Sequence, residues 1–172
     1  GVLNITPDSF FDGGKYIDPQ KALARALKLE AEGATIIDIG AESTRPNASY
    51  VSPDIELARL CPVLEVLSKR VKALISIDTS SPEVMEKVIT KYNVDLINDV
   101  RALRERDNIR DSLNVIAEAN IPVILMHMQG KPRNMQREPR YEHVLNDIYN
   151  FFVHRIEICT KYGIKKSNIM VD

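Results

Sequence analysis

The segment from Ala34 to Pro46 has an apolar first half and a polar end, and no other feature of the sequence limits the fold as strongly. Its first half contains Ile36, Ile37 and Ile39, and the second half reads Glu-Ser-Thr-Arg-Pro. A strand that is apolar along its length belongs inside a parallel sheet covered by helices. Such sheets place their binding and catalytic groups at the carboxyl ends of their strands. We therefore expect a parallel α/β fold with a functional site at those ends.

Helix signals recur along the chain. Three helices are predicted to start at a capping residue followed by proline, at Asp18-Pro19, Ser52-Pro53 and Ser81-Pro82. Gly33 should end the first helix, and Pro62 is predicted to kink or split the second. The third helix should reach about Lys91, and two further helix patterns are one that ends near Ala119 and one over 141–162 that Gly163 stops.

Strand signals fall between these helices. The predicted strands are 1–5, 35–40, 73–79, 95–100, 122–128 and one that begins at Ile169. Alternation of this kind indicates parallel strands with crossover helices, which suits either a (β/α)8 barrel or an open doubly wound sheet. No Gly-x-Gly-x-x-Gly or Gly-x-x-x-x-Gly-Lys motif follows any strand, and this weakens the case for a nucleotide-binding open sheet.

We favour the (β/α)8 TIM barrel. A complete barrel needs about 250 residues, so the 172 residues should form one incomplete barrel domain over 1–172. It would cover roughly the first five to six βα units. The start of the first strand and the last strands are expected to be missing, because the chain begins and ends abruptly.

Composition narrows the function classes. A net charge of −1 gives no field that would favour nucleic acid or an acidic membrane surface. No apolar run approaches about 20 residues, so no membrane span is expected. The two cysteines, Cys61 and Cys159, match no metal spacing, and we interpret them as reduced thiols of a cytoplasmic protein.

Each predicted strand turns polar at its carboxyl end. The residues concerned are Asn4, Glu42 to Arg45, Asp78-Thr79, Asn98-Asp99, His127 and Asp172. In a barrel they share the rim where substrates bind. Asp78, Asn98 and Asp172 offer mainly acceptor oxygens, so a complementary ligand would present a row of N–H donors, as an aminopyrimidine or guanidine-like edge does.

Other strand-end residues allow two interpretations. Arg45 suits phosphate or carboxylate, but it could equally form an ion pair with Glu42 or Asp38. Asn4 is a neutral oxygen ligand that suits Mg²⁺ held mainly by substrate phosphates and water. His127 has no clustered partner in sequence, which favours a packing role over a metal site or a general base.

Two further groups of residues also allow a structural interpretation. The basic residues of the loop after the fifth strand form either a solvated face or an attractor for an anionic substrate, and they are Lys131, Arg133, Arg137 and Arg140. Met126 and Met128 are more simply core than ligand contacts.

Taken together, six segments resemble the dihydropteroate synthase family in the family's order, across the whole chain. They are Gly1-Val-Leu-Asn-Ile-Thr-Pro-Asp-Ser-Phe10 with Asp12-Gly-Gly14, Asp38-Ile-Gly-Ala-Glu-Ser-Thr-Arg-Pro46, Ser76-Ile-Asp-Thr79, Ile97-Asn-Asp-Val100, Leu125-Met-His-Met-Gln-Gly130 and Asp172. The resemblance implies a barrel enzyme that condenses a dihydropterin methyl pyrophosphate with p-aminobenzoate, with Mg²⁺ as cofactor, in folate biosynthesis. Small-molecule substrates, a homodimer and no nucleic-acid or membrane partner are implied as well.

The resemblance also implies residue roles. Asn4 would coordinate Mg²⁺ with the pyrophosphate, while Asp78, Asn98 and Asp172 would hold the pterin N–H groups. The remaining implied residues are Met126 on the ring, Thr44 and the catalytic Arg45 near the leaving group and aminobenzoate, the catalytic Asp12 near the methylene cation, and Phe10 and Pro46 in closing loops. Sulfonamides mimic p-aminobenzoate, so any effect of these drugs is expected at the loops around Phe10 and Pro46.

The sequence departs from the family pattern in three ways. Ala41 replaces the commoner second glycine, and Phe11 stands where a small polar residue is usual. The chain also ends at Asp172, before the family's Lys and Arg-x-His groups, so residues 1–172 alone are expected to be inactive.

Two other functions stay open. A pterin-binding methyltransferase domain that uses methyltetrahydrofolate would share the acceptor-rich pocket, although the loop from Asp8 to Gly14 matches the synthase specifically. A non-catalytic barrel that binds pterin, or a regulatory subunit, is the second alternative. It is disfavoured because the polar strand-end residues are all retained.

Overall fold

The computed structural model describes residues 1–6, 18–42, 51–104, 111–130, 135 and 138–172. Its sheet consists of β1 (Val2–Asn4), β2 (Ile36–Gly40), β3 (Leu74–Asp78), β4 (Leu96–Asp99), β5 (Val123–Leu125) and β6 (Ile169–Val171). Its helices are α1 (Pro19–Ala31), α2 (Pro53–Leu67), α3 (Pro82–Lys91), α4 (Ser112–Ala119), α5 (Val144–Lys161) and a short 3-10 helix at Lys166–Asn168. The predicted alternation of strands and helices is confirmed.

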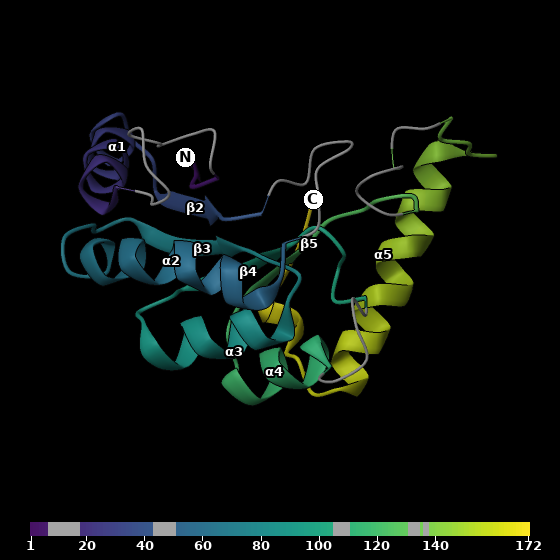
Figure 1. Ribbon diagram of the computed structural model, residues 1–172. Helices are drawn as coiled ribbons and strands as arrows, with labels where there is room; N and C mark the ends of the chain where they lie inside the picture. Colours follow the sequence, from purple (N-terminus) through teal and green to yellow (C-terminus); the bar gives the residue numbers. More distant parts are fainter. Residues whose placement is uncertain (7–17, 43–50, 105–110, 131–134, 136–137) are drawn as a thin grey trace.

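All strand pairs are parallel, and the strand order β1-β2-β3-β4-β5-β6 is the order of the sequence. Each crossover therefore advances the sheet in the same direction, as in a (β/α)8 barrel, whereas a doubly wound sheet reverses at a switch point. Figure 1 shows the helices in an arc along one side of the curved sheet, with α1 and α5 at opposite ends. These strands are six successive strands of a barrel.

The two faces of the sheet differ in chemistry because side chains alternate along a strand. The face toward the helices is apolar and buried, and it is formed by Leu3, Ile37, Ile39, Ile75, Ile77, Ile97, Val123 and Leu125. The opposite face, which is the barrel interior, carries Asp38 and Ser76 in one register row and Asp78 and Asn98 in the next. The strands are thus apolar toward the helices, and on the inside they carry these polar groups beside Leu96 and Ile124.

The predicted capping residues are confirmed. Asp18 accepts hydrogen bonds from the backbone N–H groups of Gln20 and Lys21, while Ser52 and Ser81 each cap their helix through the side-chain oxygen. Gly33 and Gly163 follow the first and last α-helices with φ of +99° and +93°, a conformation that favours glycine.

Of the two outcomes predicted for Pro62, a kink or a split of its helix, the split is wrong, because α2 runs unbroken from Pro53 to Leu67. Leu60, Val63 and Leu64 around the proline are completely buried and hold the helix against the core, whereas Pro62 itself is exposed. Tertiary packing here overrides the local penalty of a proline.

Replacing Pro62 with alanine should therefore stabilise the protein by about 1 to 3 kcal/mol, since alanine restores a backbone donor and relieves the clash in the preceding turn. Pro53→Ala is the matched control, because a proline at the first helical position loses no hydrogen bond. Urea unfolding of both variants measures the difference. Equal, near-zero changes for the two variants would show that Pro62 carries no such penalty.

Two predicted boundaries also differ. The fifth strand ends at Leu125 rather than at Met128, since beyond it the chain makes isolated hydrogen bonds such as His127 N to Asp172 O at 3.0 Å instead of a continuous ladder. The last helix begins at Val144 rather than at Tyr141, because the Asp147 carboxylate accepts from the N–H groups of Glu142 and His143 and fixes them in a turn.

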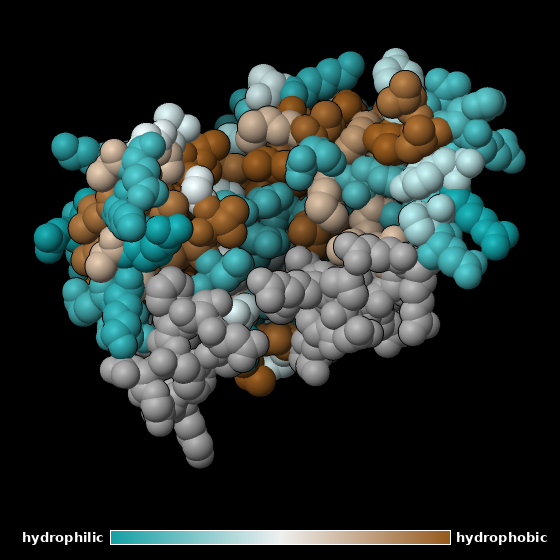
Figure 2. Space-filling view, turned by 90° about the horizontal axis from the view of Figure 1, so that it is seen from above, coloured by the Kyte–Doolittle hydropathy of each residue, from teal (hydrophilic) through white to brown (hydrophobic). Residues whose placement is uncertain are grey.

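Apolar side chains also reach the surface. Figure 2 shows hydrophobic residues in several patches that hydrophilic residues separate. On α5, Leu145, Tyr149 and Val153 are exposed at four-residue spacing, which marks a helix face of the kind that packs on a neighbour. Among the described residues, no helix has both the length and the apolar character needed to span a membrane.

Candidate ligand-binding site at the strand ends

One register row gathers the predicted acceptors at the carboxyl end of the sheet. Asn4 pairs with Gly40, Gly40 with Asp78, and Asp78 with Asn98. A Cβ atom placed on Gly40 would lie 3.3 Å from Asp78 Oδ2 and 3.6 Å from Asn4 Oδ1. Two acceptor oxygens from neighbouring strands thus converge over a residue without a side chain, and even a methyl group at Gly40 would be crowded by Asp78 Oδ2.

A second polar group lies one row further into the barrel. Asp38 Oδ2 accepts a hydrogen bond from Asn98 Nδ2 at 3.0 Å, and Asp38 Oδ1 accepts one from Ser76 Oγ at 2.5 Å. Asn98 therefore reaches across β3 to a carboxylate on β2. The hydrogen bonds link three adjacent strands directly beneath the acceptor row.

Asp78 lies in an environment that disfavours its charge. Burial, followed by the negative charges of Asp38 and Asp99, raises its pKa from 3.8 to about 8. The environment of Asp78 therefore favours the neutral carboxyl over the carboxylate in the ligand-free protein. A ligand that presents N–H donors would stabilise the carboxylate form of Asp78. Side chains with a strongly shifted pKa are often found in binding sites.

Asp99 belongs to the opposite face of β4 and has a structural role. Its fully buried carboxylate accepts from Ser80 Oγ, from the Arg101 N–H at 2.9 Å and from the Leu103 N–H at 2.8 Å. Burial raises its pKa, and these three hydrogen bonds oppose the rise. Ala102 and Leu103 both have a φ of 55°, so this carboxylate holds a turn that non-glycine residues rarely adopt.

The Asp99 turn also joins the ends of three strands. Ser80 follows β3, while the Asp99 carbonyl accepts from the Met126 N–H at 3.4 Å, just beyond β5. The Thr79 N–H donates to the Asn98 carbonyl at 3.1 Å. The strands that carry Asp78, Asn98 and Met126 are therefore fixed relative to one another from the helix side.

Five predicted site residues fall among the described residues. Asn4, Asp78 and Asn98 come together in one row, as the sequence predicts. Met126 is half-buried after β5, and Asp172 follows β6 with its N–H donating to the Leu125 carbonyl at 2.9 Å. Both lie at the same end of adjacent strands.

The other predicted site residues lie outside the described residues, and they are Phe10, Asp12, Thr44, Arg45 and Pro46. The same holds for the proposed ion pair of Arg45 with Glu42 or Asp38. Within the described ranges, Asp38 bonds to Ser76 and Asn98 instead.

His127 packs among aromatic rings. Its ring centroid lies 4.9 Å from that of Phe151, edge to face, and 5.9 Å from that of Tyr141. Burial and the nearby Arg104 guanidinium lower its pKa. In the part of the chain that the structure describes, no group of three His, Cys, Asp or Glu residues could hold a metal ion. These contacts favour the packing interpretation of His127.

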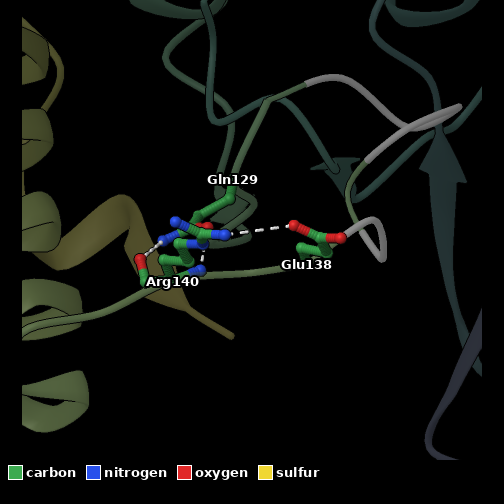
Figure 3. A network of polar contacts seen from close by, with 3 residues as sticks. All are labelled: Gln129, Glu138 and Arg140. Carbon is green, nitrogen blue, oxygen red and sulfur yellow. Dashed lines mark hydrogen bonds and ion pairs between the residues drawn. The ribbon is translucent and has the colours of Figure 1, made fainter.

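Gln129 forms hydrogen bonds to the far end of the loop that follows β5. Its side-chain amide donates to the Arg140 carbonyl at 2.6 Å and accepts from the Arg140 N–H at 3.1 Å, as Figure 3 shows. The Arg140 guanidinium contacts Glu138 at 3.2 Å, and both side chains are exposed. Arg140 therefore fits a solvated face, while Lys131, Arg133 and Arg137 fall outside the described residues.

Sequence reasoning missed the bond between Asp38 and Asn98. The sequence places Asp38 only within the family motif and as one possible partner of Arg45. The signal that could have found it is spacing, because Asp38 and Gly40, like Ser76 and Asp78, lie two residues apart and must face the same side of the sheet.

The fold and the site define a (β/α)8-barrel protein whose inner strand ends carry a row of acceptor oxygens. The chain belongs to the pterin binding enzyme family, whose model matches residues 1–172. The chain is 46% identical to the dihydropteroate synthase of Haemophilus influenzae and 43% identical to that of Escherichia coli, over its whole length. It spans 61% and 59% of these curated relatives.

Solved structures agree with this assignment. The Yersinia pestis dihydropteroate synthase in complex with a sulfonamide drug matches with a TM-score of 0.90 and 45% identity, over the whole chain and 61% of that structure. The Xanthomonas albilineans dihydropteroate synthase with 4-aminobenzoic acid matches with a TM-score of 0.86 and 39% identity, over the whole chain and 59% of that structure. The predicted barrel fold is confirmed.

Proposed function

We propose that the full-length protein is a dihydropteroate synthase, which joins a dihydropterin methyl pyrophosphate to p-aminobenzoate and releases pyrophosphate. The observation that carries this proposal is the row of Asn4, Asp78 and Asn98 at the carboxyl ends of the strands, in which Asp78 and Asn98 are half-buried and Asn4 is exposed. A pterin presents an amino group and a ring N–H side by side, which suits bidentate pairing with a carboxylate. The names of the relatives support the same assignment.

The residues have distinct proposed roles. Asp78, Asn98 and Asp172 accept hydrogen bonds from the pterin, and Met126 packs against its ring. The predicted roles of five further residues stay predictions, for they lie outside the described ranges: Asp12 beside the reacting methylene, Thr44 and Arg45 at the leaving group and aminobenzoate, and Phe10 and Pro46 in closing loops.

The reaction needs little acid–base chemistry. The bond between the methylene carbon and the pyrophosphate oxygen breaks with its electron pair on the oxygen, and the pterin ring delocalises the cation. The arylamine nitrogen then forms the new bond to carbon and loses a proton. Asp78 and Asn98 contribute by fixing the ring, so that the methylene group points out of the acceptor row toward the amine.

Asn4 has the chemistry expected of a Mg²⁺ ligand in such a site. Its neutral amide oxygen faces the space over Gly40 with Asp78 Oδ2 on the other side. Mg²⁺ in phosphate-transfer sites is usually held by few protein oxygens, with phosphates and waters as the other ligands. When bound, the ion would neutralise the charge of the departing pyrophosphate.

Pyrophosphate release by the full-length protein tests this function. With the dihydropterin pyrophosphate and Mg²⁺, release should depend on p-aminobenzoate, and Asn4→Ala should reduce it by about tenfold or more. Asn146→Ala, at an exposed position on α5, is the control. Pterin binding without pyrophosphate release would overturn the proposal and favour the methyltransferase or the non-catalytic binding protein.

Pterin affinity should depend on pH through Asp78. The carboxylate is the form that accepts N–H donors, and its pKa in the ligand-free protein is about 8. The dissociation constant should therefore fall about tenfold for each pH unit between about pH 6 and 8, and level off above.

Calorimetric titration over that pH range measures this slope. Asn98→Ala is the matched control, because it retains Asp78 and should keep the slope while weakening binding at every pH. Asp78→Asn should remove the slope. A wild-type affinity that is flat with pH would contradict the proposed role of this carboxyl.

Assembly and location follow from the same proposal. We expect a cytoplasmic homodimer that acts on small molecules and binds no nucleic acid, and we expect sulfonamides to compete with p-aminobenzoate. The apolar face of Leu145, Tyr149 and Val153 on α5 is exposed among the described residues, and it offers one surface on which a neighbouring helix could pack.

A further inference from the structure

We propose that Asp38 is a positioning residue of the pterin site, which fixes the side-chain amide of Asn98 so that its oxygen faces the ligand. This inference rests on the proposed pterin-binding function and assigns a new role within the same site. Asp38 itself acts through Asn98 rather than through contact with the ligand.

The geometry of Asp38 determines which way the Asn98 amide points. Both carboxylate oxygens of Asp38 act as acceptors, one from Ser76 Oγ at 2.5 Å and the other from Asn98 Nδ2 at 3.0 Å. The opposite amide orientation would set the Asn98 oxygen against a carboxylate oxygen, with no hydrogen between them. The carboxylate therefore selects the orientation with nitrogen toward Asp38 and oxygen away from it.

Ser76 makes the arrangement rigid. Its side chain is fully buried on β3, between the strands of Asp38 and Asn98, and its hydroxyl donates to Asp38. Both Asp38 oxygens are thereby engaged on the inner face of the sheet. The carboxylate has a fixed position from which to hold Asn98.

The orientation matters because the ligand presents donors. Asn98 shares a register row with Asp78, so both meet the same edge of the ligand. With the oxygen toward the ligand, Asn98 accepts a hydrogen bond. After a flip of the amide, an NH₂ group would face the N–H of the ligand, and both donors would lose their partners in a half-buried site.

A double-mutant cycle on pterin affinity tests the inference. The full-length wild-type protein, Asp38→Ala, Asn98→Ala and the double variant are titrated with a pterin by calorimetry. The measurement is made at about pH 9, where Asp78 is ionised whether or not the Asp38 charge is present. At this pH, an effect of Asp38 on the protonation of Asp78 does not contribute.

We expect each single substitution to weaken binding by about tenfold, and the double variant to bind no more weakly than Asn98→Ala. Asp38→Asn keeps one acceptor oxygen for Asn98 Nδ2, so it should weaken binding less than Asp38→Ala does and should likewise lose its effect in the Asn98→Ala background. Independent effects that multiply in the double variant would overturn the inference.

Asp95→Ala separates positioning from a general loss of stability. Asp95 also joins two strands through its side chain, accepting from the Ile75 N–H at 2.8 Å, but at the opposite end of the sheet. Asp95→Ala should lower the thermal midpoint and leave pterin affinity unchanged. If it weakens binding as much as Asp38→Ala does, the role of Asp38 is only structural and the inference fails.

The wild-type titration distinguishes a failure of the proposed function from a failure of the inference about Asp38. A wild-type protein that binds no pterin overturns the proposed function and this inference together. A wild-type protein that binds pterin, with a cycle that shows no coupling between Asp38 and Asn98, overturns the inference alone.

Discussion

Replacing Asp78 with asparagine is expected to weaken pterin binding about a hundredfold above pH 8, because it removes a charge-assisted pair of hydrogen bonds. The same substitution should stabilise the protein. Weaker binding together with higher stability is expected when a residue serves ligand binding and destabilises the ligand-free fold. The environment of Asp78 favours the ligand-bound protein over the free protein.

The sign of the stability effect follows from the pKa. In the folded protein the pKa of Asp78 is raised to about 8 from 3.8, so between these values the folded state binds more protons than the unfolded state. The stability contribution of Asp78 is therefore fully present below about pH 4 and falls by about 1.4 kcal/mol per pH unit up to about pH 8. Because asparagine does not titrate, the Asp78→Asn variant does not lose this stability as the pH rises.

Thermal unfolding of wild type and Asp78→Asn at about pH 5 and pH 8 measures the effect, and the gap between their midpoints should widen at the higher pH. Asp54→Asn, at an exposed position in the first turn of α2, should change the midpoint little at either pH. A variant that is less stable than the wild type at the higher pH would contradict the assignment of a buried, destabilised carboxyl.

Asp99→Ala is expected to have the opposite effect on stability and to lower the free energy of unfolding by about 3 kcal/mol or more. It removes the acceptor for Ser80 Oγ and for the N–H groups of Arg101 and Leu103. These donors lose their partner in a buried site. Ala102 and Leu103 would also lose the bonds that hold their left-handed conformation.

Urea unfolding compares this loss with that of Asp111→Ala. Asp111 also accepts a backbone N–H, that of Leu113 at 2.9 Å, as the capping residue of α4. Its removal should cost about 1 kcal/mol. Losses of equal size for the two variants would show that Asp99 is no more than an ordinary cap.

Local signals predicted much of the fold. The caps at Asp18, Ser52 and Ser81 marked helix starts correctly, since capping depends on residues close in sequence. The predicted split at Pro62 does not occur, because its buried neighbours on α2 outweigh the local penalty of a proline. The start of α5 was missed because it depends on Asp147, which lies inside the helix and binds the turn before it.

The candidate site was predictable only in part. Asn4, Asp78 and Asn98 were found because parallel strands bring their carboxyl ends together, a rule that needs no knowledge of side-chain contacts. The contact between Asp38 and Asn98 spans 60 residues and two strands, so it depends on the register of the sheet. The sequence pattern predicts that Asp99 lies at the substrate-binding rim beside Asn98. That placement is wrong because adjacent residues of a strand face opposite sides of the sheet.

The most direct test of the central claim is a titration of the full-length protein with a pterin and with its analogue methylated at the ring N–H. The row of Asn4, Asp78 and Asn98 is proposed to bind the ligand through acceptor oxygens, so the methyl group removes a donor that these oxygens need. We expect the analogue to bind about tenfold or more weakly. Equal affinity for the two ligands would contradict it.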